Sequence, residues 1–299
     1  MFKIAYHPIY VYPVPDKHRF PMEKYELLPL QLIHQGIVNE KNFFEPSLDK
    51  KYDFSIHNKD YLNRLINLEL TKKEERASGF KLSKNLVDRE ICITNGTIEV
   101  SVSAMKDGIG FNIAGGTHHA FSNRPEGFCL LNDQAIASMH LLNKGLVKRV
   151  LIVDLDVHQG NGTAEILANE SRVFTFSMHG LKNYPTNKPK SDLDIALDDN
   201  IKDSEYLKNL RKYLPQIIEK HKPNLIFYQS GVDVLKTDKL GRLSLSLAGC
   251  KERDNIVYEN AKSRNIAVVT TMGGGYSEDI KYILEAHCNT FKSAIKHFK

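Results

Sequence analysis

The sequence has few cysteines and no long apolar run. Its 299 residues include only four cysteines, Cys92, Cys129, Cys250 and Cys288, and no two of them form a Cys-x-x-Cys pair. This spacing argues against a disulfide framework and favours free thiols in a reducing compartment, so we expect the protein to be cytoplasmic. Because no run of about 18 apolar residues occurs and the first residues lack the apolar stretch of a signal peptide, we expect no membrane span.

The sequence also lacks a strong excess of charge of one sign. Lysine and arginine number 41 and aspartate and glutamate 36, a formal net charge of +5. The basic residues Lys72 and Lys73 are followed directly by Glu74 and Glu75, which is typical of a solvated surface. Since no aromatic-basic signature of DNA or RNA binding accompanies them, we expect no direct nucleic-acid binding. The hydrophobic (41%) and charged (26%) fractions exclude a disordered, collagen-like or coiled-coil chain.

Short apolar runs alternate with longer helical patterns from about residue 109 onward, which predicts parallel strands joined by helices. The strand candidates are residues 110–114, 150–157, 173–177, 224–229 and 266–271, and the helix candidates are residues 132–144, 163–169, 204–220, 247–263 and 278–298. We expect Pro215 to bend or divide the third of these helices. Shorter helices are expected at residues 22–34 and 59–67, packed on the same sheet. The chain is long enough for two domains, but this pattern predicts one α/β domain, residues 1–299.

Acidic and imidazole side chains follow two of the predicted strands. Asp154, Asp156 and His158 alternate along the end of one strand and therefore point the same way. Asp233 follows another strand, and ligands of open α/β sheets bind at the carboxyl ends of strands. Each residue alone is as well explained by a helix cap or a turn, but buried carboxylates need a cation or hydrogen-bond donors. Together, two carboxylates and one imidazole predict a catalytic metal site.

A histidine pair and a glycine-rich loop supply further candidate groups. His118 and His119 follow two glycines and are expected in a loop from which both side chains can reach one site. Taken alone, such a pair is also explained by chance or by a surface position. Near the end of the chain, three glycines precede Tyr276. Glycines let the backbone approach a ligand closely, and a phenol is a neutral donor suited to a developing oxyanion.

These motifs, taken together and in this order, resemble those of the metal-dependent histone deacetylase family. The motifs are Gly115-Gly-Thr-His-His-Ala120, Gly127-Phe-Cys129 with Asn132-Asp133, Asp154-Leu-Asp-Val-His-Gln-Gly-Asn-Gly162, Ser230-Gly-Val-Asp233 and Gly273-Gly-Gly-Tyr276. Within the family, the Gln159-Gly-Asn-Gly162 run and the compact chain resemble the class IV branch and its bacterial relatives. The resemblance implies an arginase/deacetylase-like α/β fold of three layers, in which helices flank a mostly parallel β-sheet.

The resemblance also implies roles for individual residues. The residues that match the ligands of one Zn²⁺ per chain are Asp156, His158 and Asp233, a donor set hard enough to accept Fe²⁺ as well. The residues that match the catalytic machinery are His118, His119, Tyr276, Asp154 and Asn161. Asn161 stands where class I members have a second aspartate. The residues assigned to substrate binding are Gly127, Phe128, Tyr184 and Gly274, and those that resemble a structural K⁺ site are Asp154 and Ser177.

The predicted function is zinc-dependent removal of acetyl or longer acyl groups from lysine side chains of peptides or proteins, by metal-activated water. One alternative is a deacetylase of small N-acyl amines such as acetyl-polyamines, and another is a non-catalytic module that binds acyl-lysine. A two-metal ureohydrolase of the arginase type is disfavoured. Gly160 and Leu235 lie two positions beyond His158 and Asp233, so the second metal lacks carboxylate ligands.

Overall fold

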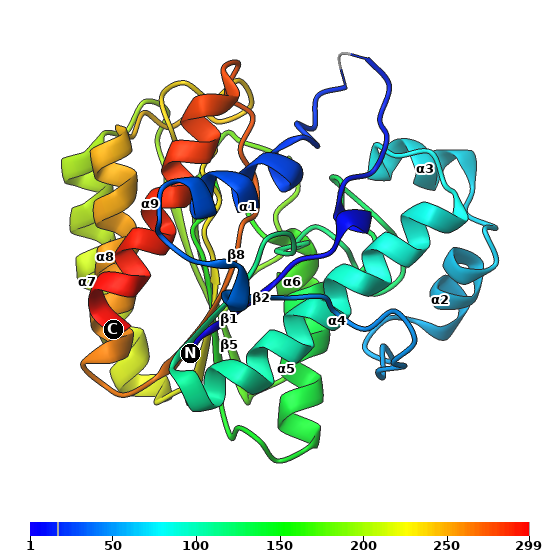
Figure 1. Ribbon diagram of the computed structural model, residues 1–299, viewed down its shortest axis with the longest axis horizontal. Coiled ribbons are helices and arrows are strands. Elements are labelled where there is room, and N and C mark those ends of the chain that lie inside the picture. Colours follow the sequence, from blue (N-terminus) through cyan, green and yellow to red (C-terminus); the bar gives the residue numbers. More distant parts are fainter. Residues whose placement is uncertain (17, 299) are drawn as a thin grey trace.

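The computed structural model describes residues 1–16 and 18–298, and its centre is an eight-stranded parallel β-sheet (Figure 1). The strands are β1 (Lys3–Ala5), β2 (Phe43–Phe44), β3 (Ile109–Asn112), β4 (Val150–Asp154), β5 (Val173–Gly180), β6 (Leu193–Leu197), β7 (Leu225–Gln229) and β8 (Ala267–Thr271). They lie in the order β2-β1-β3-β8-β7-β4-β5-β6, and every neighbouring pair is parallel. The predicted α/β class is therefore confirmed.

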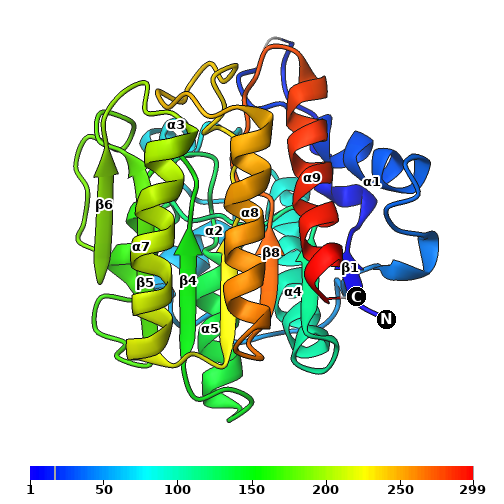
Figure 2. The same cartoon turned by 90° about the vertical axis from the view of Figure 1, so that its left-hand side faces the viewer.

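Helices cover both faces of the sheet and complete the three layers (Figures 1 and 2). One face is covered by α7 (Asp203–His221), α8 (Leu247–Lys262) and α9 (Ile280–Phe298), with α1 (Lys24–His34) packed against α9. The other face carries α4 (Lys84–Asp107), α5 (Asp133–Asn143) and α6 (Asn161–Ile166), and α2 (Lys59–Ile66) and α3 (Lys72–Ser78) lie outside α4. Short 3₁₀ turns occupy η1 (Pro8–Tyr10) and η2 (Glu40–Asn42). Among the helices described, none combines the length and apolarity that crossing a membrane requires.

The central strands are apolar because both faces of the sheet are covered. β4 reads Val-Leu-Ile-Val-Asp and β7 reads Leu-Ile-Phe-Tyr-Gln, and every residue of both is buried. The helix ends carry the expected caps. In α4, the Ser83 side chain accepts a hydrogen bond from Leu86 N at the start, and Gly108 adopts a left-handed conformation (φ +86°) at the end.

Most elements predicted from the sequence are present, with ends that shift by a few residues. Two details of the prediction are wrong. β4 ends at Asp154, so Asp156 and His158 lie in the following loop and not on the strand. Of the two effects expected of Pro215, a bend or a division of the helix, the division does not occur, because α7 runs unbroken through the proline. Leu210, Leu214 and Ile217 on either side of the proline are buried, so packing holds the helix together.

Several elements are absent from the sequence-based prediction: β1, β2, β6, α3 and α4. The strands β1 and β2 have only three and two residues, too few to show an alternating pattern. The helix α4 is 24 residues long but is buried on more than one side, and its buried set includes Arg89, Glu90 and Asn95. Its apolar periodicity is therefore weak, and local sequence alone does not reveal it.

The strand order places the ends of β4 and β7 next to each other. From β4 the chain moves outward through β5 and β6, then returns past β4 to form β7 and β8 on its other side. The sheet therefore has a topological switch point at the β4–β7 pair, where the loops that follow the two strands diverge and leave a crevice. The chain segments 155–160 and 230–246 meet at this place.

Close packing between β3 and α4 gives a stability prediction. A Cβ atom built on Gly110 lies 2.7 Å from Val100 Cγ2 and 3.1 Å from Val100 O. Gly110→Ala should therefore lower the free energy of unfolding by about 1–3 kcal/mol, measured by urea denaturation. Val102→Ala is the control, because this side chain lies on the exposed surface of α4 (48% exposed) and its truncation should cost little stability. An equal loss in both variants would show that β3 and α4 do not pack this closely.

Candidate active site

Three buried side chains converge at the carboxyl end of the sheet. Asp156 and His158 come from the loop after β4, and Asp233 comes from the loop after β7. Their candidate ligand atoms all lie within 4.8 Å of one another, and His158 Nδ1 is 3.1 Å from both Asp156 Oδ1 and Asp233 Oδ2. The structure therefore brings together the three residues that the sequence singled out as metal ligands.

Backbone amides hold the two carboxylates in place. Asp156 Oδ2 accepts a hydrogen bond of 2.8 Å from Gly274 N, and Asp233 Oδ1 accepts one of 2.9 Å from Val157 N. A Cβ atom on Gly274 would collide with the carboxylates of Asp156 and Asp233, so a residue with a side chain does not fit there. Gly274, expected to bind substrate, therefore also packs directly against the candidate ligands.

The electrostatics of this cluster call for a cation. Burial lowers the pKa of His158, but the hydrogen bonds and charges of Asp156 and Asp233 outweigh it and raise that pKa to about 10. Burial and the charge of Asp156 raise the pKa of Asp233 to about 7. In the absence of a metal, His158 and Asp233 therefore bind protons at the place that the metal would occupy. Two carboxylates and an imidazole are a donor set that Zn²⁺ accepts, so the residues fit a divalent ion.

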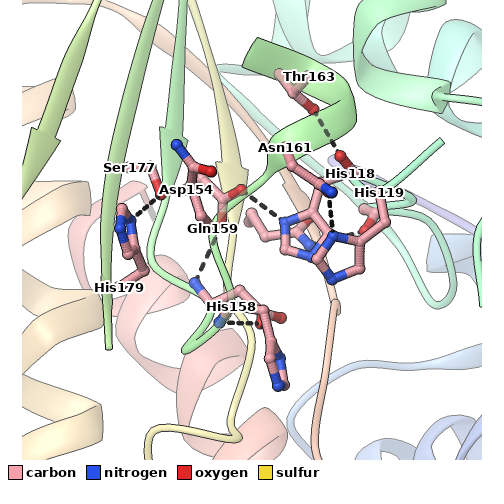
Figure 3. Close-up of polar contacts among 12 residues, drawn as sticks. His118, His119, Asp154, His158, Gln159, Asn161, Thr163, Ser177 and His179 are labelled. Atoms are coloured by element: carbon pink, nitrogen blue, oxygen red, sulfur yellow. Dashed lines mark hydrogen bonds and ion pairs between the residues drawn. The ribbon is translucent and has the colours of Figure 1, made fainter. Parts of the chain in front are cut away.

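His118 is held by a buried carboxylate. Its Nδ1 lies 2.7 Å from Asp154 Oδ2, and Asp154 Oδ1 accepts a hydrogen bond from Asp156 N. Figure 3 marks the contact between His118 and Asp154 with a dashed line. Burial disfavours the charged imidazolium, but the charges of Asp154 and Asp156 outweigh burial, so the pKa of His118 is raised above its usual value. His118 is therefore suited to carry a positive charge.

His119 is held by an amide instead. Its Nδ1 lies 2.6 Å from Asn161 Oδ1 (Figure 3). Burial and the neighbouring rings of His118 and His158 hold the pKa of His119 well below its usual value. His119 is therefore neutral and can accept a proton. Two adjacent histidines whose environments push their pKa values in opposite directions are suited to different roles in acid–base chemistry.

Tyr276 follows the glycine run after β8 and faces the same site. Its backbone N–H donates to Asp238 Oδ2 at 2.6 Å, and its ring centroid lies 6.3 Å from that of His158. Burial, with the charges of Asp233 and Asp156, raises the pKa of Tyr276 well above its usual value, so the phenol keeps its proton. From α1, Lys24 Nζ donates to Gly273 O at 2.7 Å and anchors the start of the glycine run.

A cavity of about 600 Å³ leads from the surface to these residues. Phe128 and Tyr184, expected to wall an acyl-lysine tunnel, both line it, and so does Gly127. Tyr184 is 43% exposed, and its ring centroid lies 5.2 Å from that of His119. A smaller cavity of about 40 Å³, lined in part by Arg89 and Cys129, continues beside the histidine pair. The outer cavity is large enough to hold a long side chain. The inner cavity has room for about one small chemical group.

Sequence reasoning missed two polar residues that support the site. Glu126 lies directly before the Gly127–Phe128 motif, and its Oε1 accepts hydrogen bonds from Asn161 Nδ2 and Tyr184 Oη. Arg253 on α8 is fully buried and donates to Leu155 O, Ser230 O and Gly231 O, in the two loops that carry the candidate ligands. In the sequence Arg253 stands in a charged run, so no signal separated it from a surface residue.

The residues expected at a monovalent-cation site lie side by side. Asp154 and Ser177 are paired in register between β4 and β5. Ser177 Oγ is 2.9 Å from His179 Nδ1, and Asp154 is engaged with His118. The adjacency is as expected, and K⁺ at this place stays a prediction.

Comparisons with known proteins agree on one family. The family model of the histone deacetylase domain matches residues 18–291. An uncharacterized protein of Picosynechococcus sp. is 39% identical over 294 residues, with 98% of each chain covered. Histone deacetylase 2 of Arabidopsis thaliana is 30% identical over 269 residues, which cover 87% of this chain and 70% of that protein.

Solved structures share the fold. An HDAC homologue from Aquifex aeolicus superposes with a TM-score of 0.82 at 24% identity, over 98% of this chain and 84% of that one. Acetylpolyamine aminohydrolase from Burkholderia pseudomallei superposes with a TM-score of 0.80 at 16% identity, over 98% of each chain. At these identities the likeness concerns the fold, which an HDAC homologue and an acetylpolyamine aminohydrolase share.

The protonated cluster gives a prediction for metal binding. A divalent ion must displace the protons on His158 and Asp233, so the affinity for Zn²⁺ should weaken as the pH falls from 8 to 6, by roughly tenfold per pH unit for each proton displaced. Calorimetric titration of the metal-free protein should show one ion per chain. Asp233→Asn should abolish this binding, whereas His34→Gln, at an exposed histidine, should leave it intact. A pH-independent affinity would contradict this account of the cluster.

Proposed function

The chain belongs to the histone deacetylase family, and on that premise we propose that it is a zinc-dependent amidohydrolase that removes acetyl or longer acyl groups from lysine side chains of peptides or proteins. One observation carries the proposal. The buried Asp156–His158–Asp233 cluster lies together with a histidine pair with opposite pKa directions and a phenol that keeps its proton. Of these residues, His119, His158 and Tyr276 line the open outer cavity. Amide hydrolysis needs these three elements: activation of the electrophile, proton transfer and oxyanion stabilisation.

Asp156, His158 and Asp233 are the residues that would hold the metal. When bound there, a divalent ion polarises the amide carbonyl and lowers the pKa of water. All three side chains are buried, which strengthens the electrostatic interactions among them. Fe²⁺ is a second ion that this donor set accepts. Asp154 and Ser177 are the residues we propose for a structural K⁺.

The two histidines divide the proton transfers between them. His119, kept neutral, accepts the proton of the attacking water and then donates it to the leaving amine of lysine. His118, whose pKa the Asp154 carboxylate raises, keeps a positive charge beside the reaction and stabilises the negative charge that develops. Tyr276 donates its phenolic hydrogen bond to the oxygen of the tetrahedral intermediate.

The charges at the cavity mouth favour a peptide over a polyamine. The charged residues that line the outer cavity, apart from histidine, are Arg19, Arg76 and Glu126. Both arginines are exposed, whereas Glu126 is already engaged by Asn161, Tyr184 and Arg124. A polyamine carries several ammonium groups and needs free carboxylates near the mouth, so the two arginines repel it. They attract a peptide that carries acidic residues beside its acyl-lysine.

The role of Tyr276 can be tested by removing its hydroxyl oxygen. Tyr276→Phe removes the hydroxyl and should lower kcat by about 100-fold or more, because a lost oxyanion donor has this effect. Zinc content, measured by atomic absorption, should be unchanged, since the phenol is not a ligand. The matched control is Tyr282→Phe, at a partly exposed tyrosine outside the cavity. Near-normal turnover in Tyr276→Phe would remove this residue from the mechanism.

The choice of substrate can be tested with zinc-loaded enzyme. We expect kcat/KM for acetyl-lysine peptides with acidic flanks to exceed that for peptides with basic flanks by about 3- to 30-fold at low salt, and to exceed that for acetyl-polyamines. The double variant Arg19→Glu/Arg76→Glu should reverse the order of the peptides, whereas Lys106→Glu, at the end of α4, should not. Faster hydrolysis of an acetyl-polyamine than of every peptide would favour the alternative function.

A further inference from the structure

Glu126 connects the candidate base to the wall of the substrate cavity. Its Oε1 accepts a hydrogen bond of 2.7 Å from Asn161 Nδ2 and another from Tyr184 Oη. Its Oε2 lies 3.4 Å from Arg124 Nη2 at the surface. The Glu126 side chain is 18% exposed, whereas Asn161 is 1% exposed. A largely buried carboxylate therefore lies directly behind the amide that contacts His119.

The backbone of Glu126 is fixed on both sides. Glu126 N donates to Cys129 O at 3.0 Å and Cys129 N donates to Glu126 O at 2.9 Å, which closes a tight turn. The two central residues, Gly127 and Phe128, have φ values of +52° and +66°. The amides of the same two residues donate to Ala77 O and Ser78 O at the end of α3. The carboxylate is thus presented from a rigid support.

The contact with Glu126 determines which way the Asn161 amide faces. A carboxylate only accepts hydrogen bonds, so the Asn161 atom that faces it must be the donor Nδ2. The other end of the amide, the acceptor Oδ1, then lies 2.6 Å from His119 Nδ1. Because Oδ1 cannot donate, His119 Nδ1 must carry the hydrogen. The lone pair of the neutral ring is therefore on Nε2, the nitrogen that a general base needs free.

We propose that Glu126 is a positioning residue that selects the Nδ1–H tautomer of His119 by orienting Asn161, and that holds Tyr184 on the cavity wall with the same oxygen. This inference rests on the proposed function, because it concerns the base of that reaction. It assigns to Glu126 a task that a surface carboxylate paired with Arg124 does not have. Without Glu126, the Asn161 amide is free to turn and present Nδ2 to His119, which moves the ring hydrogen to Nε2.

The same contact explains why an amide, and not a carboxylate, stands at position 161. An aspartate there would place a second negative charge about 2.7 Å from Glu126 Oε1. The pair Glu126 and Asn161 therefore works as a unit. Asn161→Asp alone should lower kcat by at least tenfold. Adding Glu126→Gln should recover much of that loss, because the glutamine amide can donate to the new carboxylate.

The kinetic test compares three single variants on one acetyl-lysine peptide. Glu126→Ala removes the acceptor and should lower kcat by about 10- to 100-fold, a part of the roughly 100- to 10,000-fold that general acid–base catalysis contributes. Glu126→Gln keeps an acceptor oxygen and should retain kcat within about threefold of wild type. Arg124→Gln removes only the ion pair at Oε2 and should leave kcat unchanged. A fall in Glu126→Gln as large as in Glu126→Ala, or no fall in either, would overturn the proposal.

A second measurement does not depend on activity. In ¹⁵N NMR spectra of imidazole-labelled protein, the His119 signals are assigned by their loss in His119→Gln. They should show a protonated Nδ1 and an unprotonated Nε2 in wild type, and the reverse or a mixture in Glu126→Ala. The same tautomer in both proteins would contradict the role of Glu126. If the wild type hydrolyses no acyl-lysine peptide, the proposed function fails, and the NMR result still decides whether Glu126 orients Asn161.

Discussion

The structure depends on the need to neutralise two carboxylates that are buried beside each other. Asp156 is 1% exposed and Asp233 fully buried, and both face the ring of His158. Removing such charges from water costs several kcal/mol per ion unless a partner compensates. A single imidazolium leaves the cluster with a net negative charge, whereas a divalent cation balances two carboxylates and leaves the imidazole neutral. The site is therefore most easily understood as one built to hold a metal.

The fold supports this cluster from both faces of the sheet. On one face, Arg253 of α8 donates to carbonyls of both ligand-bearing loops, and Lys24 of α1 anchors the glycine run before Tyr276. On the other face, Asp133 at the start of α5 accepts hydrogen bonds from Gly116 N and Thr117 N, and so holds the loop that carries the histidine pair. Helices that are distant in sequence thus fix the geometry of loops that have little regular structure of their own.

The sequence was sufficient to predict the α/β class, the central strands and the candidate ligands, because buried parallel strands are continuous apolar runs and the polar residues that follow them stand out. It was not sufficient for β1, β2 and α4, whose patterns are short or buried on several sides. It also missed Glu126 and Arg253. Both act through contacts with residues far away in the chain, at Asn161 and Leu155, and only the tertiary structure brings these partners together.

In the proposed mechanism, Asp156, His158 and Asp233 hold one catalytic metal beside the cavity. Anomalous diffraction at the zinc edge from crystals of the zinc-loaded protein tests this most directly. We expect a single strong peak per chain, with a carboxylate oxygen of each aspartate and His158 Nδ1 at about 2.0–2.2 Å from it. A peak elsewhere, or a second peak of equal height in the same cavity, would rule out a single metal held by these three residues.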